Sequence, residues 1–155
     1  MKRRIMPPTL LILSTVLATL AAFAPGGLAQ GSPGADTAGA VIPSVGVVAY
    51  YFHGNVRCTT CRTIERLAHE TIAADFPDEL ASGALAWRAL NVDERANEHF
   101  VEDFKLVTRS LVLVSYRDGE VVRFQNLDKV WQLVRDEAAF SQYVRESTRA
   151  FLDEG

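Results

Sequence analysis

The sequence predicts an α/β protein with a central, mixed four-stranded sheet flanked by helices. Strand-like apolar runs alternate with amphipathic helical stretches along the chain from Val45 to Leu152. The dipeptide Asp118-Gly119 separates two short apolar runs, which is a strong signal for a tight antiparallel hairpin. The resulting order is strand, helix, strand, helix, strand, strand, helix. This order favours an open mixed sheet with helices on both faces.

The first half of this pattern contains two strands and two helices. Val45 to Phe52 is rich in β-branched and aromatic residues with little alternation, as in a strand buried on both faces. Leu85 to Val92 is predicted to be a second strand, and Asp93 is expected to cap a short helix over Glu94 to Phe104. A longer helix is predicted over Thr59 to Ala74. Its apolar face would consist of Ile64, Leu67, Ala68, Thr71 and Ile72, and that of the short helix of Phe100, Val101 and Phe104.

The second half consists of the hairpin and two helical segments. Leu111 to Tyr116 and Val121 to Phe124 are the predicted strands of the hairpin. Leu127 to Val134 is expected to be helical or a helix-like turn, with Trp131 in the core. A final amphipathic helix is predicted over Glu137 to Leu152, and its apolar stripe would consist of Phe140, Tyr143, Val144, Ser147 and Phe151.

The N-terminal residues have the pattern of a secretory signal peptide. A basic start is followed by an uncharged apolar run from Thr9 to Ala24 and then by small residues that favour cleavage after Ala29. We therefore expect a signal peptide over residues 1–29, a flexible Gly-, Ala-, Ser- and Pro-rich linker over 30–42, and a single domain over 43–155. Export would place this domain in the periplasm or outside the cell, unless the apolar run is retained as an N-terminal membrane anchor.

The charge balance argues against nucleic acid as a partner. The full chain has 16 Lys and Arg and 19 Asp and Glu, which gives a net charge of −3. Removal of the leader, with its three basic residues, leaves 13 − 19, or −6. An acidic domain without a basic stripe lacks the electrostatic footprint of a nucleic-acid-binding protein.

The chemistry of the chain is concentrated in Cys58-Thr59-Thr60-Cys61, which contains both of its cysteines. The motif lies between the first strand and the first helix. The unpaired N–H groups at the start of that helix favour a thiolate, and so does the neighbouring Arg57. Cys58 is therefore the candidate nucleophile and Cys61 the candidate resolving thiol. In this setting a CxxC motif indicates a reversible dithiol–disulfide couple, and no cofactor other than this disulfide is expected.

Three other residues near the motif are candidates for supporting roles. Thr59 and Thr60 occupy the first turn of the helix, where their hydroxyls are expected to cap free N–H groups. His53 ends the first strand. It is either a proton donor and acceptor for the thiols or an ordinary loop histidine, and the sequence leaves both interpretations open.

From Val45 to Leu152 the chain resembles the thioredoxin-like superfamily. The resemblance rests on the CxxC after the first strand, on a strand ending in Asn91-Val92-Asp93, and on the hairpin from Leu111 to Phe124. It implies a thioredoxin-like fold and exchange of electrons with thiols and disulfides of a partner protein. More narrowly, Tyr50 to Cys61 resembles exported bacterial thioredoxin-like proteins named as a subunit of a nitrophenyl-compound reductase.

The chain departs from the thioredoxin pattern in the surroundings of the motif. Tyr50-Tyr51-Phe52 has no acid where thioredoxins hold a buried carboxylate. Val107 to Ser110 stands where the family has its cis-proline loop. The resemblance therefore implies that Thr108 and Arg109 face the CxxC, where Arg109 would stabilise the thiolate or contact an anionic substrate.

The sequence predicts an extracytoplasmic thiol–disulfide redox protein that exchanges electrons with a partner protein or a membrane donor. Two alternatives stay open. One is an accessory electron-transfer subunit of a nitroaromatic reductase system, which the narrower resemblance implies. The other is a binding protein whose two thiols hold Cu(I) or an arsenical, because soft thiolates suit such ions. A structural metal site is not expected, since it would need four ligands.

Overall fold

The computed structural model describes residues 45–154. The predicted signal peptide and linker therefore lie outside the described residues. The described part of the chain contains, in order, β1 (Val45–His53), α1 (Thr59–Asp75), α2 (Pro77–Ser82), β2 (Leu85–Asn91), α3 (His99–Asp103), β3 (Ser110–Arg117), β4 (Glu120–Asn126), α4 (Val130–Leu133) and α5 (Glu137–Asp153). None of the helices in residues 45–154 is long and apolar enough to cross a bilayer.

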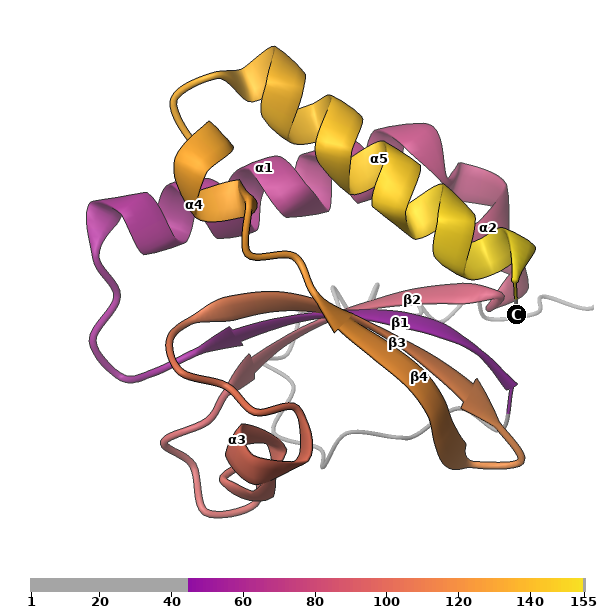
Figure 1. Ribbon diagram of the computed structural model, residues 1–155, viewed down its shortest axis with the longest axis horizontal. Coiled ribbons are helices and arrows are strands. Elements are labelled where there is room, and N and C mark those ends of the chain that lie inside the picture. The colour runs from indigo at the N-terminus through magenta and orange to yellow at the C-terminus, as the bar shows by residue number, and fades with distance from the viewer. Residues whose placement is uncertain (1–44, 155) are drawn as a thin grey trace, which may run out of the picture. The chain divides into compact units, whose positions relative to one another are not determined.

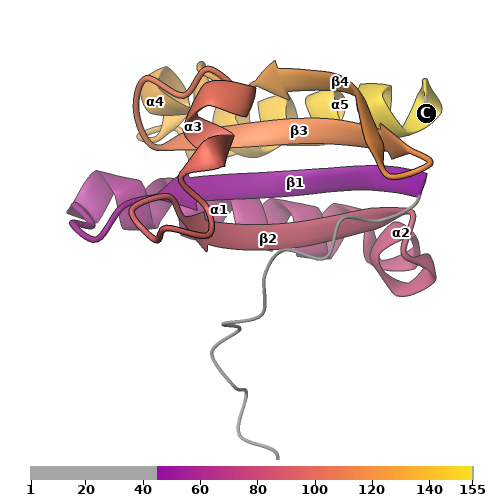
Figure 2. The same ribbon diagram turned by 90° about the horizontal axis from the view of Figure 1, so that it is seen from below.

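The four strands form one mixed sheet in the order β2-β1-β3-β4 (Figure 2). β1 pairs in parallel with β2 and antiparallel with β3, and β4 extends the sheet antiparallel to β3. β1 is thus a central strand, in agreement with its continuous apolar sequence. The predicted α/β class and the mixed four-stranded sheet are confirmed.

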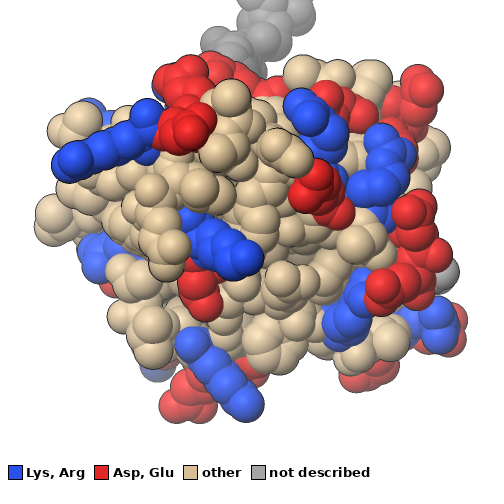
Figure 3. All heavy atoms as spheres, turned by 45° about the horizontal axis from the view of Figure 1, so that its top comes forward, with Lys and Arg blue, Asp and Glu red and all other residues tan. Residues whose placement is uncertain are grey.

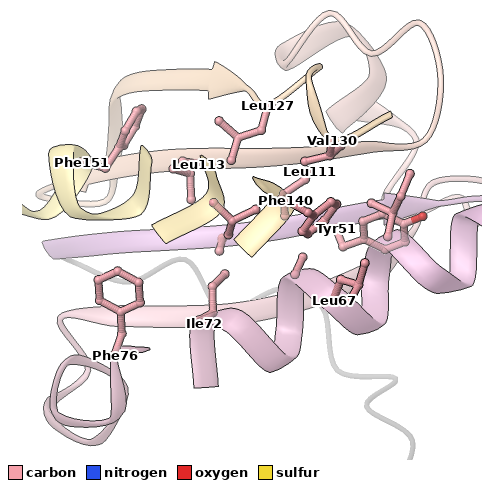
Figure 4. Packing of buried hydrophobic residues seen from close by; sticks show 14 of the residues in the cluster. Tyr51, Leu67, Ile72, Phe76, Leu111, Leu113, Leu127, Val130, Phe140 and Phe151 are labelled. Carbon is pink, nitrogen blue, oxygen red and sulfur yellow. The ribbon is translucent and has the colours of Figure 1, made fainter. Parts of the chain in front are cut away.

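The larger core lies between the sheet and the layer that contains α1 and α5 (Figure 1). Alternate residues of β1, such as Ala49 and Tyr51, point into this core because side chains in a strand alternate between the two faces. Figure 4 shows Tyr51 of β1 close to Leu67 of α1 and Phe140 of α5 in this core. β1 and the two long helices therefore share this core.

The opposite face of the sheet is covered at one end by α3 (Figure 1). Tyr50 and Phe52 of β1 stack on each other there and lie against Phe100 and Phe104. The hydroxyl of Tyr50 is hydrogen-bonded to that of Tyr116 at 3.1 Å. Neighbouring residues of β1 thus enter two separate cores, and only the odd-numbered residues face the helix that begins at the CxxC.

Ion pairs join α5 to α1 and to α2 at the surface. Arg145 of α5 contacts Asp75 at 2.8 Å, and Arg149 contacts Glu79 of α2 at 2.9 Å. Figure 3 shows basic and acidic side chains interspersed over this side of the molecule, with no block of one sign. Exposed pairs of this kind contribute little stability individually, so the apolar layer beneath them dominates the packing of α5.

The structure corrects three local predictions. Pro77 ends α1 as a continuous helix but also begins the additional helix α2, because proline is well suited to the first helical turn. The helix predicted from Glu94 begins only at His99, so Asp93 does not cap it. Val101 is 37% exposed. Phe100 and Phe104 are four residues apart and share one face, whereas Val101 points away from that face.

The predicted hairpin and the final helix are present, with a small shift in the buried face of the helix. The turn at Asp118 and Gly119 has positive φ values of 54° and 81°, as a tight hairpin turn requires. On α5 the buried stripe contains Thr148 in place of the predicted Ser147. Four-residue steps from Phe140 through Val144 lead to Thr148, so the stripe follows the helical period more closely than the sequence-based assignment did.

Candidate redox site

Cys58 and Cys61 form a disulfide at the point where the chain leaves the sheet and begins α1, with a Cα–Cα distance of 5.1 Å. Cys58 is the N-cap residue of the helix, in an extended backbone conformation. Its Sγ accepts a hydrogen bond from the backbone N–H of Cys61 at 3.1 Å. The first turn of α1 contains no acidic residue. The sulfur of Cys58 therefore occupies a position that stabilises negative charge.

The two sulfurs differ in their accessibility. Cys58 is exposed, whereas the side chain and backbone of Cys61 together are only 4% exposed. A thiolate from another molecule can therefore reach Cys58 and not Cys61. This asymmetry is the arrangement needed for an attacking cysteine and a resolving cysteine.

Tyr51 is a component of the site that the sequence analysis did not identify. Its hydroxyl donates a hydrogen bond to the carbonyl oxygen of Cys61 at 2.6 Å. Burial raises the pKa of this phenol to about 12, although the nearby guanidinium groups of Arg57 and Arg109 act in the opposite direction. Tyr51 is thus a neutral hydrogen-bond donor at physiological pH. The two-residue period of β1, which places Tyr51 on the face toward the helix, was the signal in the sequence.

Arg57 lies beside the motif, as its position in the sequence requires, and is partly buried. Its guanidinium group forms an ion pair with Glu65, which lies on α1 beyond Cys61. Part of its charge is therefore balanced by a carboxylate that the sequence analysis did not consider. Arg57 also acts to lower the pKa of Tyr51, whose hydroxyl is bonded to the carbonyl oxygen of Cys61.

Arg109 connects the loop before β3 to the loop before the CxxC. Its Nη2 donates to the carbonyl oxygen of Val56 at 3.4 Å, and its own carbonyl oxygen accepts a hydrogen bond from Nε1 of Trp131 at 3.2 Å. Thr108 is exposed, and its carbonyl oxygen accepts a hydrogen bond from the Ser110 hydroxyl. Of the two residues expected to face the CxxC, it is Arg109 whose side chain contacts the neighbouring loop.

Asp93 completes this junction of loops from a third direction. Its Oδ2 accepts the backbone N–H of Asn55 at 2.7 Å, and the side chain of Asn91 donates to that of Asn55 at 2.8 Å. Gly54 is buried between the charged groups. A Cβ atom there would lie 2.8 Å from both Asp93 Oδ2 and Arg109 Nη2. Asp93, predicted as a helix cap, instead holds the loop that leads to Cys58.

Thr59 and Thr60 do not supply the helix cap that was predicted for them. The N-cap is Cys58, whose sulfur takes the free N–H of Cys61. Both threonines are exposed in the first turn. A sulfur acceptor replaces the expected hydroxyl because the disulfide directs Sγ of Cys58 back toward the helix start.

His53 is partly buried at the end of β1, and its Nδ1 donates to the carbonyl oxygen of Gly54 at 3.1 Å. Burial lowers its pKa below the usual value, and the nearby Arg57 adds to this effect. The hydrogen bond to Gly54 and the carboxylates of Glu94 and Asp93 act in the opposite direction. His53 is therefore a neutral imidazole at physiological pH.

The depressed pKa of His53 predicts a specific loss of stability in acid. The unfolded chain binds a proton at about pH 6.5, above the pKa of the folded chain. The contribution is thus fully present above pH 6.5 and is lost as pH falls through the pKa of the folded state. We expect the free energy of unfolding, measured with urea at pH 8 and pH 5, to fall further in the natural chain than in His53→Gln. Equal losses would contradict this.

Cys58 and Cys61 are the candidate ligands for a thiophilic ion. Residues 45–154 contain no group of three or more His, Cys, Asp or Glu side chains placed to hold a metal ion. Cys58 and Cys61 are oxidised to a disulfide, and a disulfide does not act as a thiolate ligand. Ion binding would require prior reduction of the pair.

The fold and the site together define a class of protein. A CxxC disulfide caps the helix of a β-α-β unit, and an antiparallel hairpin completes the mixed sheet. This is a thioredoxin-like fold with the CxxC in the position of a redox motif.

Among solved structures the chain is similar to thioredoxins. No protein-family model matches it, and no curated protein does. Oxidised thioredoxin from Plasmodium falciparum has 14% identity and a TM-score of 0.39, with 66% of this chain and 81% of that chain covered. Oxidised thioredoxin O2 from Arabidopsis thaliana has 18% identity and a TM-score of 0.38, with 64% and 75% covered. Thioredoxin from Trypanosoma brucei brucei has 20% identity and a TM-score of 0.38, with 67% and 76% covered.

Proposed function

We propose that this protein is a thiol–disulfide redox protein that acts outside the cytoplasm through the Cys58–Cys61 couple. The observation that carries the proposal is the asymmetry of the pair, with an exposed Cys58 capping α1 and a buried Cys61 bonded to it. A disulfide built for stability alone would be expected to join distant parts of the chain. This one closes a single helical turn and leaves one sulfur open to attack.

The reaction follows from this geometry. A partner thiolate attacks Sγ of Cys58, the Cys58–Cys61 bond breaks, and Cys61 leaves as a thiolate that takes up a proton. A second thiol of the partner, as thiolate, then attacks the partner sulfur of the mixed disulfide and releases Cys58. Two electrons pass to the couple and the partner gains a disulfide. The reverse sequence, which begins with attack by the Cys58 thiolate, reduces a partner disulfide.

The predicted leader over residues 1–29 supports the extracytoplasmic location, because a secretory signal peptide directs export. The disulfide is compatible with this location, because disulfides persist in oxidising compartments. Fractionation of cells that produce the full chain tests this part directly. We expect a shortened protein in the periplasmic or extracellular fraction. A protein of full length in the cytosol would contradict it.

Thiol trapping tests the chemistry. The purified protein is equilibrated with reduced and oxidised glutathione or dithiothreitol over a range of ratios and then alkylated with a maleimide that shifts its mobility. We expect both thiols to appear and disappear together, reversibly. Cys58→Ala/Cys61→Ala is the control that shows no shift. A pair that stays oxidised at every ratio, or that once reduced does not re-form, would contradict a redox function.

The same samples examine the alternative of ion binding. Titration of the reduced protein with Cu(I) or arsenite shows whether the thiols bind such ions tightly. Tight binding combined with a pair that does not re-form its disulfide would favour the binding function.

The narrower role of an accessory subunit in a nitroaromatic reductase system rests on the resemblance of Tyr50 to Cys61 alone. Transfer of electrons from the reduced pair to such a reductase would be its test.

A further inference from the structure

We propose that the Cys58–Cys61 couple works as an oxidant, which donates its disulfide to dithiols. This inference rests on the proposed function and adds the direction in which the electrons move. The direction is set by which state the surroundings stabilise, because stabilising the reduced form makes a disulfide a stronger oxidant. The structure offers a backbone donor to the sulfur of Cys58, and it places the guanidinium groups of Arg57 and Arg109 in contact with segments next to the motif.

The first contribution acts on Cys58. Its sulfur already accepts the N–H of Cys61 at 3.1 Å, so a thiolate at this position keeps a backbone donor. It lies at the N-cap of a helix of 17 residues, and the first turn of this helix has no acid to oppose a negative charge. The helix dipole and the hydrogen bond both favour the thiolate over the neutral thiol.

The second contribution acts on Cys61, the sulfur that leaves when a partner attacks. The hydroxyl of Tyr51 is 2.6 Å from the carbonyl oxygen of Cys61 and therefore reports on its surroundings. The charges that act on this hydroxyl are Arg57 and Arg109, and both lower its pKa. Burial is the larger effect and raises the pKa of this phenol to about 12. The buried position of Cys61 therefore opposes a departing thiolate, and the two guanidinium groups offset part of this cost.

Three acids lie in the same neighbourhood as these arginines. Glu65 is paired with Arg57, and Asp93 accepts the N–H of Asn55 in the preceding loop. Asp93 and Glu94 act on the pKa of His53 at the end of β1. His53 itself is neutral at physiological pH and adds no charge. Arg57, Arg109 and Glu65 are therefore the charges to alter in a test.

The test measures the equilibrium between the couple and glutathione, with a thioredoxin in the same buffers as reference. We expect the natural chain to oxidise reduced glutathione further than the thioredoxin does. Arg57→Gln and Arg109→Gln should each reduce the equilibrium constant, on the order of threefold to tenfold. Glu65→Gln should raise it, because the charge of Arg57 is then no longer balanced. Arg145→Gln, which alters a distant ion pair on α5, is the matched control and should leave the constant unchanged.

The opposite signs expected for Arg57 and Glu65 distinguish electrostatics from general damage, since loss of an ion pair would move both variants in one direction. A couple that cycles but is no more oxidising than the thioredoxin overturns the inference and leaves the proposed function intact. Arginine variants with an unchanged constant also overturn it. A pair that exchanges with no thiol at all overturns both proposals.

Discussion

Replacement of Cys58 by serine is expected to abolish disulfide exchange, whereas replacement of Cys61 by serine traps the partner. Cys58 is the exposed sulfur, so its loss leaves only a thiol that is 4% exposed. In Cys61→Ser the thiolate of Cys58 still attacks a partner disulfide, but no resolving thiol follows and the mixed disulfide accumulates. Incubation of each variant with a disulfide-containing peptide, followed by mass spectrometry, measures both outcomes. Turnover should fall to the level without protein in both variants.

The matched comparison is the rate at which each single thiol is alkylated. Cys58 in the Cys61→Ser variant should react with iodoacetamide at least tenfold faster than Cys61 in the Cys58→Ser variant, because it is both accessible and stabilised as a thiolate. Equal rates would show that the asymmetry of the oxidised structure does not persist after reduction. A mixed disulfide that forms preferentially on Cys61 would contradict the assigned roles.

Much of the fold was predictable because its signals are local. The continuous apolar sequence of β1 specifies a strand with two buried faces, and the helical spacing from Ile64 to Ile72 specifies the buried face of α1. The dipeptide Asp118-Gly119 was enough to predict the hairpin, because these residue types favour the positive φ values that a tight turn requires and that both adopt here. The additional helix α2 was missed because Pro77 both ends one helix and begins another. A proline in a sequence does not distinguish these roles.

The site was predictable where it depends on sequence neighbours and unpredictable where it depends on contacts across the fold. The position of the CxxC before a predicted helix was enough to place Cys58 at the N-terminus of that helix. The pairing of Arg57 with Glu65 of α1, and the hydrogen bond from the N–H of Asn55 to Asp93, arise only once the chain has folded. Propensity assigned Asp93 to a helix cap, but the helix begins later, and the carboxylate serves the neighbouring loop.

Tyr51 is the clearest example of a contact across the fold that the sequence did not predict. Its side chain was noted in the sequence only as the place where an acid is absent. In the structure it is a fully buried member of the larger core whose polar end reaches Cys61 (Figure 4). The ring packs in the core and the hydroxyl bonds to Cys61, so substitutions that remove one or both should have different effects.

Tyr51→Ala is expected to lower the free energy of unfolding by about 3–5 kcal/mol, because it removes a buried aromatic ring and leaves a cavity beneath α1. Tyr51→Phe keeps the ring and loses the hydrogen bond to Cys61, which should cost only about 1 kcal/mol. Urea unfolding of the oxidised protein measures both values. A loss of similar size in the two variants would show that the hydroxyl, and not the ring, dominates at this position.

Tyr50→Phe is the matched control for the hydroxyl. Tyr50 is the preceding residue of β1, is equally buried, and donates to or accepts from Tyr116 on the opposite face of the sheet. Both phenylalanine variants should lose about 1 kcal/mol of stability. Only Tyr51→Phe should slow the reduction of the disulfide by dithiothreitol, severalfold, since only this hydroxyl positions the turn from which Cys61 departs. Equal reduction rates in the two variants would confine Tyr51 to a packing role and would leave the arginines as the groups that act on Cys61.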